Sequence, residues 1–427
     1  MQKSVLLFGM LLVAHFGWAQ SLKPIAAKVY QAKQQSADFS KTSLFSQAAS
    51  VTTRPELAGQ WAKGLLVQPD REKIRDLRGN APDRLEISLP DPDGGALQLE
   101  LVRAQVFSQE FTVRQASDRN APVVVDPGLH YWGIVKDQPH TLAGISIFES
   151  DVVGIVYAGT EKLVFADLEQ DPSGIHIIYR ERDLASRPGF ECMSEMLEDV
   201  SDGAVAQDRS TGPDNCVRMY MEADYTIFQN KGSVAAATTY IESLPAAAAL
   251  PMWMCYALAC YGVGYSGINT TYSNVPTYSW TVEVVTHEIG HNLGSQHTHA
   301  CAWNGNNTAI DGCGPAAGYS EGCNAALPTA GTIMSYCHLV SGVGIDLNLG
   351  FGPQPGDRIR NEVYNAACLA ACGGGGPCSY GPVNSQNFDG GWGSGPTAAP
   401  TAPASTALPM PTAAPIPFVC AIIPAFF

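Results

Sequence analysis

Four of the nine histidines in this chain of 427 residues lie in one short stretch, VTHEIGHNLGSQHTHACAW at residues 285–303. His287 and His291 are four residues apart, so on an α-helix their rings lie one above the other and could bind one metal ion. Gly294 follows where a left-handed residue could end the helix and reverse the chain. That reversal would bring His297 to the same ion, and imidazole is a good ligand for Zn²⁺.

Three neutral imidazoles leave the fourth position of a tetrahedral zinc site open for a water molecule, which is typical of a catalytic site. Glu288 follows the first histidine, about 100° round the helix, so its carboxylate can reach that water without joining the ligands. The spacing therefore predicts His287, His291 and His297 as ligands of one zinc ion and Glu288 as the general base. His299 could compete for the third position, but the chain reversal favours His297.

The segment that carries the first two ligands has the residues of a strand. Positions 282–286 are mostly β-branched, and such residues favour extended structure. Only a helix stacks the two histidines, so the metal motif overrides this propensity. We predict a largely buried helix from about 280 to 293, capped near Ser279 or Thr281.

Two motifs together carry a family resemblance. HEIGHNLGSQH at 287–297 and GTIMSYC at 331–337 resemble the zinc signature and the Met-turn of metzincin metallopeptidases, most closely the bacterial reprolysin-like (adamalysin) branch. The resemblance implies that Met334 forms an apolar floor beneath the imidazoles. Tyr336 stands where astacin-like and serralysin-like metzincins place a tyrosine, whose hydroxyl could stabilise the oxyanion, although a buried structural phenol is the alternative. Thr298 departs from the acidic residue of reprolysins, which leaves the subfamily open.

The first 19 residues are typical of a secretory signal peptide. Lys3 precedes an apolar run from residue 5 to about 14, and Gly17 and Ala19 are the small residues that a signal peptidase reads. The run is too short for a membrane anchor, and no other segment is long and apolar enough to span. We therefore expect a secreted protein without a membrane span.

The cysteines agree with an oxidising destination. The chain has twelve, eight of which lie between Cys255 and Cys372. Disulfides could hold an irregular subdomain around the zinc motif and the Met-turn, with the connectivity open. A zinc finger is the alternative, but the CxxC pair that it needs is missing from the sequence. The cysteines that flank the two motifs are Cys301, Cys313, Cys323 and Cys337.

Residues 20–198 predict a β-rich domain. RLEISLPDPDGGALQLELVRAQVF at 84–107 alternates on either side of a Pro-Asp-Gly-Gly turn, and turn residues recur at 136–137, 149–150 and 159–160. The domain resembles the propeptide that precedes reprolysin-type catalytic domains, and an independent β accessory domain is the alternative. The propeptide reading implies a zymogen.

Cys192 lies near the end of this domain and has two open interpretations. As in several metzincin propeptides, its thiolate could bind the zinc as a cysteine switch and displace the water. A disulfide to the catalytic domain is the other interpretation, because the nine cysteines from Cys216 to Cys372 leave one that needs an outside partner, for which Cys378 is the other candidate.

The second half is predicted as a polar connection at 199–215 that is open to proteolysis, a catalytic domain at 216–372, and a Gly/Pro/Ala-rich low-complexity tail at 373–427. The catalytic domain should begin with a strand and a helix and end with the helix GDRIRNEVYNAACLAAC. The stretch from Cys216 to His287 is short for the twisted sheet of metzincins. Either an error in the gene sequence or a genuinely reduced domain would explain this, and the substrate-binding edge strand is in doubt.

The predicted fold class is thus α+β: a β-rich propeptide followed by a metzincin-type α/β catalytic domain with an active-site helix, a Met-turn and a C-terminal helix. The net charge of −15 argues against nucleic acid as a partner. The function predicted from the motifs is a secreted zinc endopeptidase that hydrolyses protein or peptide substrates through a zinc-bound water activated by Glu288. A zinc-binding pseudo-peptidase and a secreted adhesion module are the alternatives.

Overall fold

The structure is a computed structural model of an α+β chain. It describes residues 22–35, 38–50, 59–107, 111–115, 121–168, 171–185, 215–222, 225–248, 277–365, 370–371 and 417–423. The predicted signal peptide, Cys192 and most of the predicted tail lie outside these residues. Within the described ranges, no helix is both long and apolar enough to cross a membrane.

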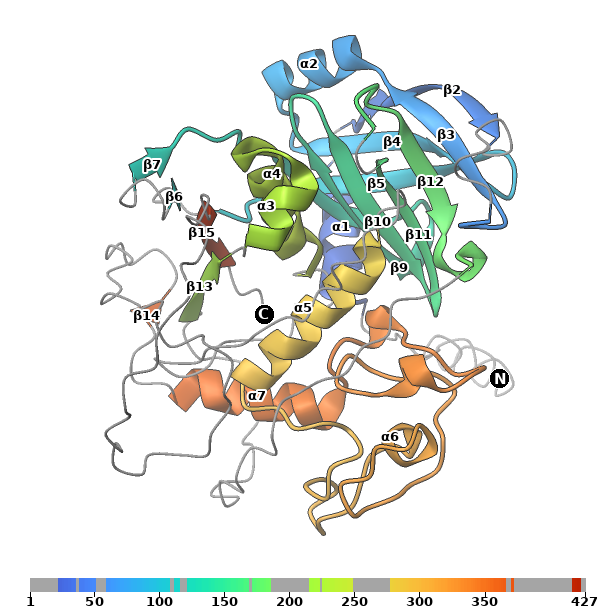
Figure 1. The fold of residues 1–427 in the computed structure, drawn as a ribbon, viewed down its shortest axis with the longest axis vertical. Coiled ribbons are helices and arrows are strands. Elements are labelled where there is room, and N and C mark those ends of the chain that lie inside the picture. Colours follow the sequence, from blue (N-terminus) through green and yellow to red (C-terminus); the bar gives the residue numbers. More distant parts are fainter. Residues whose placement is uncertain are drawn as a thin grey trace, which may run out of the picture.

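A curled ten-stranded sheet forms most of the N-terminal half (Figure 1). Its strand order is β1-β4-β5-β8-β9-β10-β11-β12-β3-β2, with every neighbouring pair antiparallel except β1 and β4. The strands are β1 (Ser40–Thr42), β2 (Phe45–Ser50), β3 (Gly64–Pro69), β4 (Arg84–Pro90), β5 (Ala96–Ala104), β8 (Leu129–Val135), β9 (Gln138–Ile147), β10 (Val152–Ala158), β11 (Glu161–Asp167) and β12 (His176–Arg180).

The hairpins predicted from the turn residues are confirmed. Strands β4 and β5 pair from Arg84↔Val102 to Pro90↔Ala96 around the predicted Pro-Asp-Gly-Gly turn. The other three turns connect β8 to β9, β9 to β10 and β10 to β11. Asp137 and Gly159 have φ of 60° and 64° in two of these turns, the left-handed conformation that such tight connections need.

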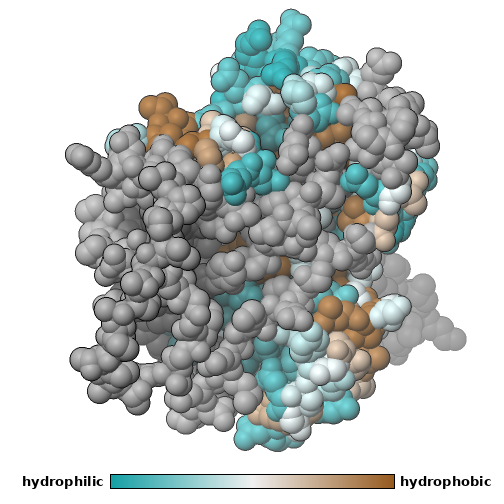
Figure 2. Space-filling model, viewed as in Figure 1, coloured by the Kyte–Doolittle hydropathy of each residue, from teal (hydrophilic) through white to brown (hydrophobic). Residues whose placement is uncertain are grey.

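Two helices lie on the outside of this sheet. Helix α1 (Pro24–Gln34) packs Ala26 and Val29 against Ile134 of β8. Helix α2 (Arg71–Asn80) buries Ile74 and Leu77, Arg78 is half-buried against Asp126, and the other side chains are exposed. Figure 2 shows the resulting hydrophilic surface over α2.

A smaller sheet and the remaining helices form the rest of the described chain. Strand β13 (Asn215–Glu222) agrees with the predicted first strand of the catalytic domain, and β15 lies within the predicted tail. The strand order is β14-β13-β15-β6-β7, all antiparallel. The elements are β6 (Val113–Gln115), β7 (Ala121–Val123), β14 (Ala370–Ala371), β15 (Pro417–Ile423), α3 (Tyr225–Lys231), α4 (Val234–Ala248), α5 (Tyr278–Asn292), α6 (Cys313–Ala316), α7 (Pro353–Asn365) and the short 3-10 helices η4 (Glu181–Asp183), η5 (Cys337–Leu339) and η6 (Leu347–Leu349).

The C-terminal helix differs from its predicted bounds. Helix α7 begins at Pro353, and Ile359 and Val363 bury its inner face. The prediction that the helix continues to residue 372 is wrong, because Ala370–Ala371 pair with Asn215 and Cys216 as strand β14.

Candidate metal centre

Helix α5 carries the first half of the zinc motif, and almost all of its side chains are buried. The buried environment explains why a β-branched segment is helical: packing against the core outweighs a propensity difference of a few tenths of a kcal/mol per residue. The helix begins two residues earlier than predicted, and the predicted caps are wrong. Thr277 is the N-cap residue, while the Ser279 hydroxyl donates to Glu181 at 2.7 Å and the Thr281 hydroxyl to the Thr277 carbonyl at 3.3 Å.

Helix α5 ends just before Gly294, as predicted from the position of this glycine. Gly294 has φ of +81°, and the Ser295 N–H donates back to the Gly290 carbonyl at 3.0 Å. A Cβ at Gly294 would also lie 2.9 Å from the Cγ atom of Glu362 on α7. Glycine is therefore required here both by the backbone conformation and by the close approach of a second helix. Beyond it the chain turns back and brings His297 over α5.

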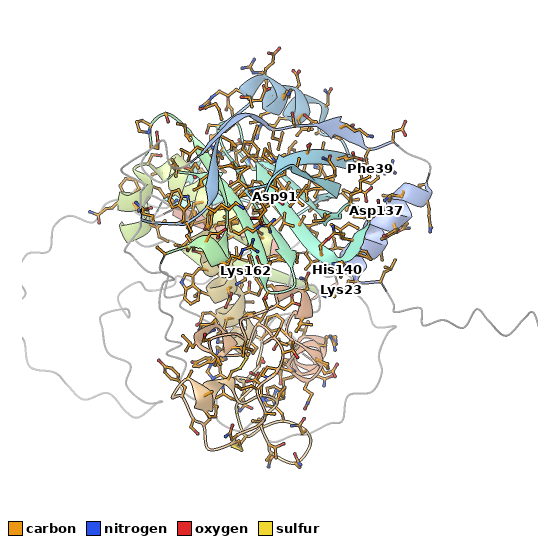
Figure 3. All side chains as sticks on the ribbon, turned by 90° about the vertical axis from the view of Figure 1, so that its right-hand side faces the viewer. Lys23, Phe39, Asp91, Asp137, His140 and Lys162 are labelled. Carbon is orange, nitrogen blue, oxygen red and sulfur yellow. A yellow bond between two sulfur atoms is a disulfide. The ribbon has the colours of Figure 1, made fainter. Side chains whose placement is uncertain are left out.

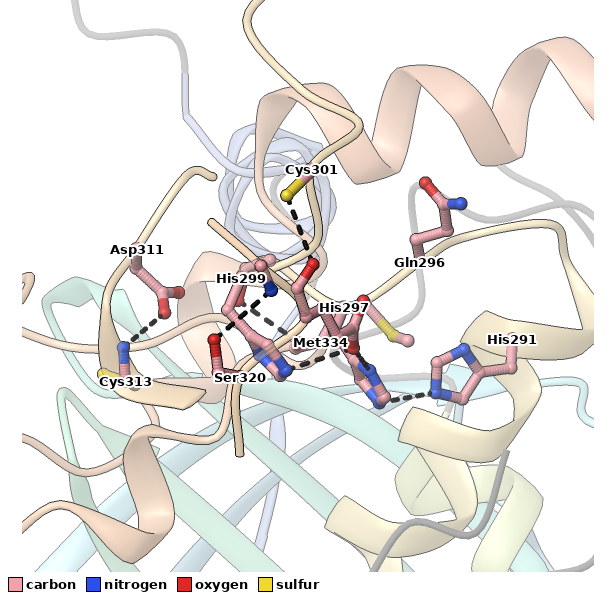
Figure 4. A network of polar contacts seen from close by, with 12 residues as sticks. His291, Gln296, His297, His299, Cys301, Asp311, Cys313, Ser320 and Met334 are labelled. Carbon is pink, nitrogen blue, oxygen red and sulfur yellow. Dashed lines mark hydrogen bonds and ion pairs between the residues drawn. The ribbon is translucent and has the colours of Figure 1, made fainter. Parts of the chain in front are cut away.

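The three predicted ligands converge through the same ring atom. The Nε2 atom of His291 lies 3.2 Å from Nε2 of His287. It lies 3.1 Å from Nε2 of His297, a contact that Figure 4 shows. These three residues form one of the groups in the described chain whose ligand atoms could hold a metal ion. With a Zn–N distance of 2.0–2.1 Å, nitrogens of a regular tetrahedral site lie about 3.4 Å apart, so the observed spacing fits zinc.

The opposite nitrogen of each ring has an acceptor of its own. The Nδ1 atoms donate to the Ile333 carbonyl at 2.8 Å, to the Ser295 carbonyl at 2.9 Å and to a carboxylate oxygen of Glu321 at 2.6 Å, for His287, His291 and His297 respectively. A carbonyl oxygen only accepts, so Nδ1 carries the proton and Nε2 presents its lone pair. Three lone pairs that face one another within hydrogen-bond distance are the donor set that a cation requires.

The electrostatics keep these rings neutral. Burial, followed by the neighbouring imidazoles, lowers the pKa of His287 well below its usual value and that of His291 to about 3. Burial also lowers the pKa of His297, although its hydrogen bond to Glu321 opposes the shift. Neutral imidazole is the form that binds a metal, so the site is ready for an ion at neutral pH.

Glu321 is the residue of the site that the sequence did not predict. Its Oε1 atom accepts from His297 Nδ1 and lies 3.1 Å from His299 Nε2. Burial opposes its charge, but the two histidine contacts lower the pKa of Glu321 to about 2. The His299 ring stacks on His297, with centroids 4.9 Å apart and planes at 7°. His299 therefore faces Glu321 rather than the three converging Nε2 atoms.

Two disulfides hold the loops around this cluster. Cys301 pairs with Cys323 and Cys313 pairs with Cys337, which confirms the predicted stapling of this region and supplies its connectivity. The first bond closes the loop that carries Glu321. Glu321 is 24 residues from His297, and no spacing rule relates the two positions in the sequence. Their contact becomes visible only in the structure, where the Cys301–Cys323 bond closes the loop.

Met334 is fully buried and packs directly against helix α5. A Cβ added at Gly290 would lie 2.3 Å from its Sδ atom, so the thioether fits against bare helix backbone between the first two histidines. The neighbouring Ile333 carbonyl accepts from His287, and the Met334 carbonyl accepts from the Thr298 N–H at 3.1 Å. The turn thus fixes both parts of the zinc motif through its backbone.

The two residues predicted to take part in the chemistry are both buried. Glu288 on α5 is 9% exposed and Tyr336 is 4% exposed. The Tyr336 ring centroid lies 4.8 Å from that of His297 and 6.2 Å from that of His287. The Tyr336 ring therefore packs against two of the three histidines, and Glu288 is the residue that follows the first of them.

Comparison with known proteins finds a similarity for the part of the chain that contains this centre. No curated protein and no solved structure matches the chain. Residues 196–341 match the family model Reprolysin_5, described as metallo-peptidase family M12. The matched range contains the zinc motif, Glu321, the Met-turn and Tyr336, and it excludes the ten-stranded sheet. The part of the chain that carries the metal centre is therefore similar to the zinc metallopeptidases of family M12.

Proposed function

We propose that this protein is a secreted zinc-dependent endopeptidase that cleaves peptide bonds in protein substrates. The observation that carries the proposal is the convergence of three unprotonated Nε2 atoms, 3.1–3.2 Å from one to the next. The match to family M12 supports the same reaction. The signal-peptide pattern at residues 1–19 and the two disulfides support export.

The residues have complementary roles in this proposal. His287, His291 and His297 would hold one zinc ion, which would polarise the scissile carbonyl and lower the pKa of a water molecule towards neutrality. The Glu288 carboxylate takes the proton of the attacking water and passes it to the leaving amine. The Tyr336 hydroxyl donates a hydrogen bond to the oxyanion of the tetrahedral intermediate.

A pair of substitutions tests these roles. Glu288→Gln keeps the three ligands, so we expect full zinc content and at least a hundredfold loss of casein cleavage, since general-base catalysis contributes about 10²–10⁴-fold. His291→Ala removes a ligand and should lose both zinc and activity. Glu72→Gln on α2 and His140→Ala, both exposed, are the matched controls and should change neither quantity.

The same experiment separates the peptidase from the zinc-binding pseudo-peptidase. Zinc content is measured by atomic emission, and cleavage is measured with and without a chelator, followed by zinc. One bound zinc per chain with no cleavage of casein or gelatin by the mature protein would contradict the proposal. Equal loss of zinc in Glu288→Gln and His291→Ala would contradict the role of Glu288.

A further inference from the structure

The central strands of the N-terminal sheet are apolar on both faces. In β10, Val152 and Val156 belong to one hydrophobic cluster, whereas Val153, Ile155 and Tyr157 belong to another. The same division occurs in β11, β9 and β12. A sheet with two apolar faces needs a covering layer on each of them.

The metal-site helix and its neighbours cover the second face. The cluster that contains Ile155 and Tyr157 also contains Val282 and Val285 of α5, and it extends to further residues of the second half of the chain. Those residues are Leu244 and Ala247 of α4, Met334 and Tyr336 of the turn, and Ile359 and Val363 of α7. The sheet and the metal centre thus share one continuous core.

A buried ion pair crosses this boundary. The Lys162 ammonium of β11 lies 2.5 Å from a carboxylate oxygen of Glu283 on α5, and both side chains are almost fully buried. Figure 3 shows Lys162 where the sheet meets the helical part of the molecule. Glu181, the first residue of η4, lies 3.3 Å from the same ammonium and accepts a hydrogen bond from the Ser279 hydroxyl of α5.

The position of this pair links it to the metal ligands. Glu283 precedes His287 by four residues, so it lies one helical turn below that ligand. Burial opposes the charge of Lys162, but Glu181 and Glu283 outweigh it and raise the Lys162 pKa. His338, whose Nδ1 atom lies 3.8 Å from Glu283, has a pKa lowered by burial. Lys162 is therefore the cation that neutralises Glu283.

We infer that the N-terminal sheet is a permanent layer of the metal-site domain, which remains bound to α5 when the chain is cut in the connection at 199–215. Departure of the sheet would expose the shared apolar face and leave Glu283 without its cation, and both changes are unfavourable. This inference concerns assembly, so it does not depend on peptidase activity.

The direct test uses the full chain with the recognition sequence of a site-specific protease inserted within residues 199–212. After complete cleavage, we expect the two fragments to elute together in size-exclusion chromatography in native buffer and to separate only in denaturant. The Tm of the cut complex should stay within a few degrees of the uncut protein. Fragments that elute apart in native buffer, whether or not the second one stays soluble, would overturn the inference.

Substitutions test the ion pair separately. Lys162→Met should lower the Tm of the full chain by about 5–10 °C, because it leaves the buried carboxylates of Glu181 and Glu283 without their cation. Adding Glu283→Leu should recover at least half of that loss. The control Lys63→Met breaks an exposed pair with Asp93 and should shift the Tm by less than about 2 °C. A Lys162→Met shift no larger than that of the control, or no recovery in the double variant, would contradict the role of the pair, and the cut chain decides the retention of the sheet in either case.

Discussion

Glu321 binds the ring nitrogen of His297 that points away from the metal centre. The His297 Nδ1 atom lies 2.6 Å from the Glu321 carboxylate oxygen, while His297 Nε2 lies 3.1 Å from Nε2 of His291. A charged acceptor at Nδ1 fixes the tautomer and the ring orientation, and it makes Nε2 a stronger ligand. Glu321 is thus a positioning residue for the third histidine, while Ile333 and Ser295 serve the other two rings through backbone carbonyls that no substitution removes.

Replacement of Glu321 should therefore weaken the metal site without abolishing it. We expect Glu321→Ala to raise the Kd for zinc about 10–100-fold, as is usual for partners of metal-bound histidines. Glu321→Gln, which keeps an acceptor but loses the charge, should lie between this variant and the parent. Competition with a chromophoric chelator measures the Kd, and Glu72→Gln is the control. An unchanged Kd in Glu321→Ala would show that the carboxylate does not act through His297.

His299 should be dispensable as a metal ligand. Its Nε2 atom is directed to Glu321, 3.1 Å away, so His299→Gln can still donate to the carboxylate. We expect this variant to keep one zinc per chain, whereas His297→Gln loses the third ligand and most of its zinc. Metal analysis of the two purified variants after dialysis distinguishes them. Greater zinc loss in His299→Gln than in His297→Gln would reverse the assignment of the third ligand.

Gly290 should not tolerate a side chain. A Cβ there would lie 2.3 Å from Met334 Sδ and 2.4 Å from Phe351 Cε1, and such overpacking costs about 1–3 kcal/mol. Gly290→Ala should lower the free energy of unfolding by this amount in chemical denaturation and displace Met334 from its place under the helix.

Gly79 near the end of α2 is the matched control for this prediction, because nothing lies within 4 Å of its virtual Cβ. Gly79→Ala should be neutral or stabilise by up to about 1 kcal/mol, as expected for alanine in a helix. Equal stabilities of Gly290→Ala and Gly79→Ala would mean that the packing of Met334 against the helix backbone is not tight.

The sheet should lose stability in mild acid through His130. Its ring lies between the Ser146 hydroxyl and the Pro127 carbonyl, each 2.8 Å away, and burial lowers its pKa from 6.5 to about 4. In the unfolded chain His130 is protonated below about pH 6.5, whereas in the folded chain it is protonated only below about pH 4. The neutral ring therefore stabilises the fold above pH 6.5, and this contribution is lost as the pH falls towards 4, by at most about 1.4 kcal/mol per pH unit.

Denaturation curves between pH 7 and pH 4 check this pH dependence. His130→Gln should be less stable than the parent at pH 7 but should lose stability less steeply as the pH falls. His140→Gln, at an exposed position, should follow the parent. Parallel curves for the parent and His130→Gln would assign the acid sensitivity to other groups.

The zinc helix and the hairpins could be predicted because their signals are local. Two histidines at helical spacing outweigh the β-branched residues between positions 282 and 286, and the buried surroundings of α5 supply the stabilisation that propensity lacks. The turns at Asp137 and Gly159 depend on residues that adopt positive φ, so the positions of these turns can be predicted from a few neighbouring residues.

The remaining relationships join residues that are distant in the chain. Glu321 reaches His297 through a loop whose disulfide pairing cannot be read from the sequence. Lys162 and Glu283 are 121 residues apart, and the pattern of β10 indicates two apolar faces without saying which helix covers the second one. The prediction of the helix cap was wrong for a related reason, because the Ser279 hydroxyl donates a hydrogen bond to the buried Glu181 and not to the end of the helix.

The Cys301–Cys323 bond gives the metal centre an order of assembly. Cys301 stands two residues after His299 and Cys323 two residues after Glu321, so this bond keeps the carboxylate beside the rings. While the thiols are still reduced, as in the cytosol, the loop is free to carry Glu321 away and His297 loses its support. In the exported peptidase that we propose, a newly made chain would then hold its metal weakly until the disulfide forms, so activity would begin only after export.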